Sequence, residues 1–283
     1  MSPMTDESKI RDAADAARGL LEAAPIYEDA LQPGAQQVGK ALETVGKAVN
    51  LALAPIGALV WGFKKIEEWV VPALEARLLT TPPERIVTPP PLIAGPAIEA
   101  LRFAGGEESL RDLYANLLAT AMDTETAHTA HPAFVEMLRQ LSPDEAKLLS
   151  HISHAPNYEL CFVDVVAAWE DRQARSTMLT HFSTLAEAAG CAFSDLVTSY
   201  LDNLARLRIV ELKENVRWAT DEAKAQYEAV SSHPRVREHV TRIEQFDKGI
   251  PEIVKGCIEI TTLGRQFIAS CVDDRSMKVV KAE

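Results

Sequence analysis

The stretch that decides the fold reads Leu78-Leu-Thr-Thr-Pro-Pro-Glu-Arg-Ile-Val-Thr-Pro-Pro-Pro-Leu-Ile-Ala-Gly-Pro96. Six of the sixteen prolines of the chain fall between Thr81 and Pro96. Each proline restricts φ and lacks a backbone N–H, so the stretch predicts a stiff, extended strap rather than a helix or a central strand. Two interpretations of this strap stay open: a ligand for an aromatic groove on a partner, or a connector between two helical units.

Short amphipathic helices are predicted after the strap. Pro96 suits the first position of a helix, and Gly105-Gly106 interrupts the chain. Apolar residues then recur at helical spacing from Ser109 to Asp123. Asp112 and Asn116 lie off that apolar stripe, one turn apart, and predict either a polar binding face or a solvated one.

The strap, the helix Ser109–Asp123 and the run His131–Ala146 together resemble the abortive infection alpha family (Abi-alpha) of bacteria. The last run contains Ser142-Pro143-Asp144-Glu145, which is typical of a capped helix start. The resemblance implies a bacterial protein linked to phage defence. It implies no catalytic residue.

Composition narrows the class of protein. The 283 residues are 47% hydrophobic and only 6% aromatic, which favours helices. A net charge of −12 argues against general nucleic-acid binding, because an acidic chain repels phosphates. The four cysteines, Cys161, Cys191, Cys257 and Cys271, are far apart, and no secretory leader is evident. We therefore expect a reduced, cytoplasmic protein, peripheral to the inner membrane in one interpretation.

The N-terminal third divides into a predicted mobile or weakly helical arm, residues 1–34, and a helical segment, residues 35–80. Ala48 to Phe63 carries no charge over sixteen residues, with a helix kink expected at Pro55. This run is either a buried core helix or an interfacial membrane segment. The candidate membrane or partner residues are Leu51, Leu53, Ile56, Leu59, Val60, Trp61, Phe63, Lys64, Lys65 and Trp69.

Two histidine pairs have the spacing of metal ligands on a helix: His128 with His131, and His151 with His154. Neither pair has a carboxylate or cysteine at ligand spacing. We therefore expect surface or capping histidines, and we assign neither a metal nor a cofactor.

The C-terminal half predicts a winged-helix-like α+β domain over residues 141–283, after a strap-and-helix unit at 81–140. Its expected elements are a helix from Gln173 to Ala189, a helix from Ser194 to Leu207, strands from Arg208 and from Cys257, a last helix capped by Thr262, and a helical insertion at about 221–247. The fold class is accordingly mainly α, with a helical N-terminal unit followed by that domain.

The helix Ser194–Leu207 would enter a DNA groove in such a domain. Its exposed side includes two aspartates and one arginine, a poor composition for contacting phosphates. We expect it to contact protein instead, through Thr198, Asn203 and Arg206.

No motif of a phosphate-binding loop, a dinucleotide fold, a hydrolase or a metalloprotease is present. The sequence therefore predicts a non-enzymatic defence protein that acts through a protein partner or self-association, with membrane association as a further option. A transcriptional regulator of the winged-helix type is the alternative. No small-molecule substrate is evident.

Overall fold

The computed structural model describes residues 28–59, 63–155, 160–171 and 173–273. The predicted N-terminal arm lies outside these residues as far as residue 27. From Glu28 the chain is already helical, and this helix continues through Pro33 and Gly34, across the predicted boundary between the arm and the helical segment.

The chain divides into two compact units, residues 1–44 and 45–283. Helix α2, Glu28–Leu59, extends across this boundary. The described part of the first unit is the beginning of that helix. The segment boundaries predicted from the sequence stay a prediction.

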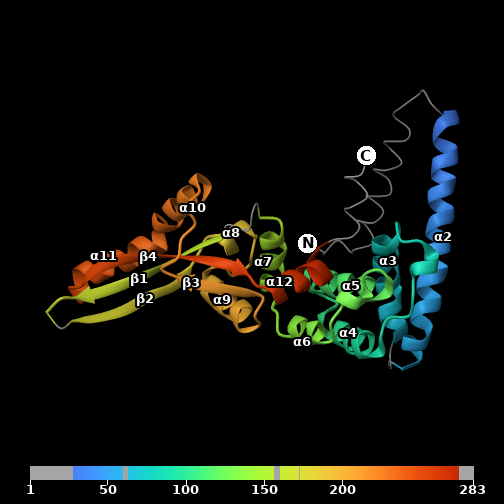
Figure 1. Cartoon of the computed structure of the whole chain (residues 1–283), viewed down its shortest axis with the longest axis horizontal. Helices are drawn as coiled ribbons and strands as arrows, with labels where there is room; N and C mark the ends of the chain where they lie inside the picture. The colour runs from blue at the N-terminus through green and yellow to red at the C-terminus, as the bar shows by residue number, and fades with distance from the viewer. Residues whose placement is uncertain (1–27, 60–62, 156–159, 172, 274–283) are drawn as a thin grey trace, which may run out of the picture. The chain divides into compact units, whose positions relative to one another are not determined.

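The second unit is mainly helical, with one sheet in its C-terminal half (Figure 1). Before the sheet come α3 (Phe63–Leu78), α4 (Pro91–Ala104), α5 (Glu108–Met122), α6 (Ala133–Leu138) and α7 (Pro143–Ser153), with short 3-10 turns η1 (Pro83–Arg85) and η2 (Ala127–Thr129). Helix α5 contacts α3, α4, α6, α7 and the C-terminal turn η6 (Ile268–Val272). Every residue of α5 from Leu113 to its end is buried, so it is the central helix of this part.

The proline strap connects α3 to α4 and is bound to the end of α5. Val87 donates its N–H to the Met122 carbonyl, and Thr124 donates to the Arg85 carbonyl. Helix α4 begins at Pro91, not at Pro96, which lies inside the helix. The prediction for Pro96 was wrong because Pro91 already occupies the favourable first position. The predicted end is confirmed: α4 stops before Gly105.

The sheet has four antiparallel strands in the order β2-β1-β4-β3. The strands are β1 (Leu160–Trp169), β2 (Ala174–Phe182), β3 (Val210–Glu214) and β4 (Ile250–Ile260). The helix predicted from Gln173 to Ala189 is therefore wrong over most of its length: only α8, Leu185–Ala188, is helical there. Pairing of β2 with β1, a long-range interaction, overrides the local helical spacing.

Helices cover both faces of the sheet. Figure 1 shows α10 (Asp221–Ser231) and α11 (Pro234–Arg242) on one side of the strands and α9 (Val197–Arg206) on the other. Accordingly β1 is buried at successive positions from Leu160 to Ala167, so both of its faces are covered. The unit ends with a π-turn η5 (Ile243–Asp247), then β4, α12 (Thr262–Phe267) and η6.

The winged-helix-like layout is not confirmed. Strands β3 and β4 are antiparallel neighbours, and α10 and α11 form the predicted helical insertion between them. However, β4 also pairs with β1 of a long hairpin that the sequence analysis missed. Two smaller corrections concern helix starts. A 3-10 turn, η4 (Ser194–Leu196), precedes α9, which begins at Val197 rather than at Ser194, and Thr261, not Thr262, caps α12.

The helix start at Ser142 is confirmed as a capping box. Ser142 accepts the Glu145 N–H, while the Glu145 carboxylate accepts the Ser142 N–H at 2.6 Å. None of the four cysteines forms a disulfide, and Cys161, Cys257 and Cys271 are buried.

Candidate functional site

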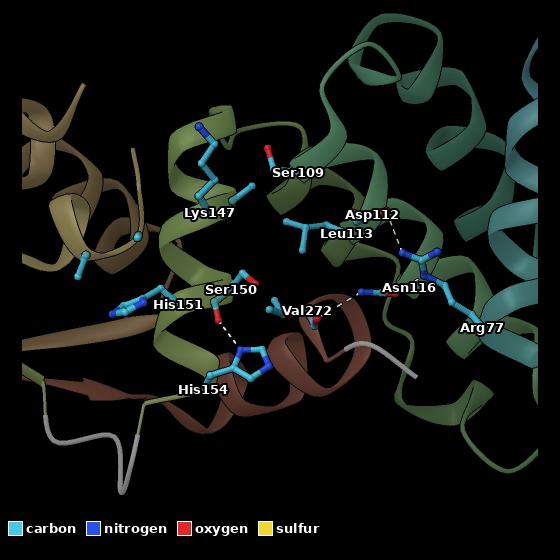
Figure 2. Close-up of a pocket in the computed structure, with 13 residues that line it drawn as sticks. Arg77, Ser109, Asp112, Leu113, Asn116, Lys147, Ser150, His151, His154 and Val272 are labelled. Carbon is cyan, nitrogen blue, oxygen red and sulfur yellow. Dashed lines mark hydrogen bonds and ion pairs between the residues drawn. The ribbon is translucent and has the colours of Figure 1, made fainter. Parts of the chain in front are cut away.

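A cavity of about 520 Å³ lies between α5 and α7 (Figure 2). Helix α7 supplies Lys147, Ser150, His151 and His154, and α5 supplies Ser109 and Asp112 among others. A cavity of this size could admit a small ligand, so the chemistry of its lining decides whether it can serve as a site.

The cation at one end of this cavity is already paired. Arg77 of α3 forms an ion pair of 2.9 Å with Asp112 and donates from Nε to the amide oxygen of Asn116. Asn116 in turn donates to the carbonyl oxygens of Cys271 at 3.0 Å and Val272 at 3.3 Å. The Arg77 side chain is only 9% exposed. This network ties α3, α5 and the C-terminal turn together, which is a structural task.

The serine–histidine contact beside the cavity is not an activated nucleophile. His154 Nδ1 lies 2.7 Å from the Ser150 carbonyl oxygen, which only accepts hydrogen bonds, so Nδ1 carries the proton. The Ser153 hydroxyl donates to the same carbonyl at 2.8 Å. Nδ1 therefore has no lone pair with which to take a proton from Ser153.

Three of the cysteine thiols are poor nucleophiles. Burial raises the pKa of Cys191, Cys257 and Cys271 above the ordinary value of a thiol. A raised pKa keeps these cysteines protonated at neutral pH, whereas a catalytic cysteine needs a lowered pKa.

The outer face of α4 carries two exposed large apolar side chains beside the exposed Glu99 and Arg102. Leu92 is 75% and Phe103 is 84% exposed. These residues are eleven positions apart, about three helical turns, so they lie on one face. The opposite face of α4 is buried, with Ile98 and Ala97 fully covered. A helix anchored on one side thus presents two large apolar side chains on the other.

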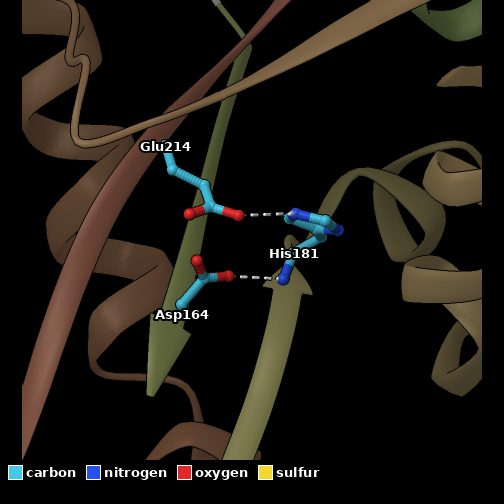
Figure 3. Close-up of side chains that lie close together, drawn as sticks. All are labelled: Asp164, His181 and Glu214. Carbon is cyan, nitrogen blue, oxygen red and sulfur yellow. Dashed lines mark hydrogen bonds and ion pairs between the residues drawn. The ribbon is translucent and has the colours of Figure 1, made fainter. Parts of the chain in front are cut away.

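A cluster of ionisable side chains lies at the sheet (Figure 3). Asp164, His181 and Glu214 each place one potential metal-ligand atom within 4.8 Å of the others. His181 Nδ1 is 2.8 Å from a carboxylate oxygen of Asp202, and Nε2 is 3.9 Å from Glu214. Burial raises the pKa of Asp164, and the nearby charges of Glu214 and Asp202 act in the same direction, against a hydrogen bond from the His181 N–H. Among the described residues, this cluster is the one able to hold a metal ion.

Comparison with known proteins then decides the family. The sequence profile of the family named abortive infection alpha matches residues 62–271. The chain belongs to the abortive infection alpha family. Membership points to a role related to abortive infection.

Other comparisons add little to this assignment. The structure of an uncharacterized protein from the hydrocarbon-degrading marine bacterium Alcanivorax borkumensis SK2 is similar at 19% sequence identity, covering 51% of this chain and 92% of that one. Its TM-score of 0.31 is too low to support an argument. Among curated proteins, none matches the chain.

The predicted membrane segment of this abortive infection alpha protein is partly core. Leu53 and Ile56 are each 1% exposed, and Trp69 packs half-buried against the core. Leu51 is 77% exposed. The side chains of Leu59, Val60, Trp61, Phe63, Lys64 and Lys65 lie outside those that the structure describes. Within the described ranges, no helix is both long and apolar enough to cross a membrane.

The predicted partner helix makes contacts within its own chain. Thr198 donates to the Thr180 carbonyl, and Asn203 donates to the Gln140 carbonyl and the Glu145 carboxylate. Arg206 donates to the side chains of Asn203 and Gln140. Asn203 and Arg206 hold α9 against the start of α7, and Thr198 holds it against β2. Sequence spacing could not reveal these contacts.

One histidine of each pair hydrogen-bonds at a helix end. His131 Nδ1 accepts the Ala133 N–H at the start of α6, and His154 donates to a carbonyl in the last turn of α7. Conversely, the sequence analysis did not single out Asp164, His181 or Glu214. They lie on three different strands and carry no periodic signal, so only the fold brings them together.

Proposed function

We propose that this protein is a non-enzymatic component of an abortive-infection defence that acts by binding protein through the outer face of α4. The observation that supports this proposal is the pair Leu92 and Phe103, which are the most exposed large apolar side chains of α4. Exposed apolar groups on one rigid element are typical of a protein-binding surface. The protein works in the cytoplasm in this proposal.

The chemistry of the cavity supports a non-enzymatic role. Arg77 is committed to Asp112 and Asn116, and the His154 Nδ1 atom is a donor rather than a base. Replacing Lys147 and His151 by alanine therefore leaves the defence intact in this proposal. An enzyme that used the cavity would lose its activity in that variant.

Among the described side chains, membrane association rests on a smaller surface. Leu51 is exposed on α2, but Leu53 and Ile56 of the same helix belong to the core. The one exposed leucine among these described candidates gives far less apolar area than an interfacial helix needs. Contact with protein is therefore the better-supported part of the proposal. Flotation of the full chain with anionic liposomes measures the membrane contribution directly.

The proposal is tested by phage challenge of bacteria that express the full chain. The double variant Leu92→Asp/Phe103→Asp should lose protection, so that plaques become as numerous as on cells without the protein. Ile250→Asp, which changes an exposed apolar residue on β4 (51% exposed), is the matched control and should protect like the wild type. Full protection by the double variant would refute the proposal that the outer face of α4 binds a protein.

Sedimentation of the purified proteins separates the two kinds of partner. If a second copy of the chain occupies the α4 face, the wild type sediments as an oligomer and the double variant as a monomer. If a different protein occupies it, both sediment alike while only the wild type protects.

A further inference from the structure

Three strands of the sheet bring together the cluster shown in Figure 3. Asp164 is on β1, His181 is on β2, and Glu214 is the last residue of β3. The β1–β2 register shifts beside Asp164, so that the pairs Val163 with Phe182 and Val165 with Leu179 enclose an extra residue on β2. A β-bulge changes the direction in which a side chain points. Here the bulge turns His181 towards the carboxylates.

The proton position on His181 leaves a lone pair facing a carboxylate. Asp202 lies 2.8 Å from Nδ1 and is acceptor-only when ionised, so Nδ1 carries the proton. In the neutral imidazole, Nε2 then presents its lone pair to the Glu214 oxygen 3.9 Å away. Two electron-rich atoms facing one another call for a cation between them. A carboxylate on the distal nitrogen is also the arrangement that orients metal-binding histidines.

A buried carboxylate with an unused oxygen points to the same place. Asp164 is only 5% exposed, and Oδ1 accepts the His181 N–H at 2.6 Å. Oδ2 accepts no hydrogen bond from the residues that the structure describes. Figure 3 shows the Asp164 carboxylate beside that of Glu214, and one oxygen of each lies within 4.8 Å of the other and of a His181 ring nitrogen. A buried carboxylate oxygen without a donor is costly unless a proton or a cation satisfies it.

We propose that Asp164, His181 and Glu214 bind one divalent transition-metal cation of the Zn²⁺ or Mn²⁺ type, with Asp202 orienting the imidazole. One imidazole nitrogen with two carboxylates is a mixed donor set that suits these ions better than Mg²⁺ or Ca²⁺, which prefer oxygen ligands alone. Bonds of about 2.1 Å place ligand atoms about 3–3.5 Å apart. The three ligand atoms now lie within 4.8 Å of one another, so a bound ion would draw them closer together. The Glu214 side chain, 62% exposed, is the ligand least restrained by packing.

The three ligands leave coordination positions for water or for a group of a partner. Glu214 and Asp202 are more than half exposed, so the ion is accessible from solvent. Strands β2 and β3 are the two edge strands of the sheet, because β1 and β4 lie between them. The cation would link these two edge strands. We therefore expect it to raise the unfolding temperature of the full chain.

The test is calorimetric titration of untagged, chelator-treated full chain with Zn²⁺, repeated with Mn²⁺ and with Mg²⁺. The wild type should bind one equivalent of Zn²⁺ or Mn²⁺ and respond far less to Mg²⁺. Glu214→Gln removes one ligand at an exposed position and should weaken binding by about tenfold or more. Glu211→Gln, on the same strand with its side chain on the other face, is the matched control and should bind like the wild type.

Two further variants test the roles of Asp202 and His181. Asp202→Asn leaves all three ligands in place but weakens the hold on the imidazole, and we expect about a tenfold to hundredfold loss of affinity. His181→Asn removes the nitrogen ligand while tolerating the left-handed backbone at this position, where φ is 48°. Absence of binding to the wild type at millimolar Zn²⁺ and Mn²⁺ overturns the proposal. Equal binding by Glu214→Gln and Glu211→Gln overturns it as well, since the ion then sits elsewhere.

Discussion

The Tyr200 hydroxyl donates a hydrogen bond of 3.0 Å to Oδ2 of Asp144 and so joins α9 to the first turn of α7. The same carboxylate accepts the backbone N–H groups of Ala192 at 2.8 Å and Phe193 at 2.9 Å. Asp144 is only 6% exposed. One buried carboxylate thus satisfies three donors that come from two other segments, at the point where the helical part meets the sheet part of the unit. It also accepts from Lys147 of its own helix at 3.3 Å.

Replacing Asp144 by asparagine should destabilise the fold. An amide has one acceptor oxygen, so at least one of the three donors loses its partner in a buried place. We expect the free energy of unfolding to fall by about 2 kcal/mol. Urea unfolding of the full chain measures it. The control Asp221→Asn, at a side chain 92% exposed, should change stability by less than about 0.5 kcal/mol. Equal effects of the two substitutions would contradict the role of Asp144.

The contribution of Asp144 should depend on pH. Burial alone would raise the pKa of this carboxyl, but hydrogen bonds from Ala192, Phe193 and Tyr200 outweigh burial and hold the pKa below its ordinary value. Because the pKa is lower in the folded state, the stabilisation is fully present above the unfolded pKa of about 4. It is lost as the pH falls through the folded-state pKa. The stability difference between wild type and Asp144→Asn should therefore be constant near neutral pH and shrink in acid. A difference that persists in strong acid would argue against this linkage.

Two glycine substitutions should act in opposite directions. A Cβ atom on Gly256 of β4 would lie 2.1 Å from the ring of Phe162, which is fully buried and cannot move aside. We expect Gly256→Ala to cost about 1–3 kcal/mol through overpacking. Gly95, inside α4, has no atom within 4 Å of such a Cβ. Gly95→Ala should stabilise by about 0.5–1 kcal/mol, since alanine has the higher helix propensity. Thermal or urea unfolding of the pair gives the sign of each effect.

Asn116 and Asp112 both bind Arg77, but they should differ in importance. Asn116 is 3% exposed and also donates to the Cys271 carbonyl. Its replacement by alanine leaves buried groups unpaired and should cost about 1–3 kcal/mol. The Asp112 side chain is 50% exposed, so Asp112→Asn should cost less than about 1 kcal/mol. The comparison is made by urea unfolding, and a larger loss in Asp112→Asn than in Asn116→Ala would overturn this order.

Local patterns located several elements correctly. The capping residues Ser142 and Glu145, the break at Gly105 and the apolar spacing from Ser109 to Asp123 each act through neighbours within a turn or two, and the structure confirms all three. The same logic failed for residues 173–189, where helical spacing indicated a helix and β2 stands instead. The reason is that β2 is stabilised by pairing with β1, which no local pattern encodes.

The candidate sites were harder to predict than the elements. Asn116 was expected on a polar surface, but Arg77 and the C-terminal turn cover it, and both are distant in sequence. Arg206 was expected to face a partner, but it binds Gln140 of its own chain. The sequence left open whether Leu53 and Ile56 lie in the core or at a membrane, because an apolar run satisfies either environment equally well. Packing against the rest of the unit decides for the core in their case.

What the sequence determined by itself was the family, the mainly helical character and the helix boundaries set by prolines, glycines and caps. These properties depend on residue chemistry over a few positions. Only the tertiary structure decided which polar groups meet: Arg77 with Asn116, Asp144 with Tyr200, and Asp164 with His181 and Glu214. The partners come from elements that are far apart in the chain, and their distances follow from strand pairing and helix packing, which arise only when the whole unit has folded.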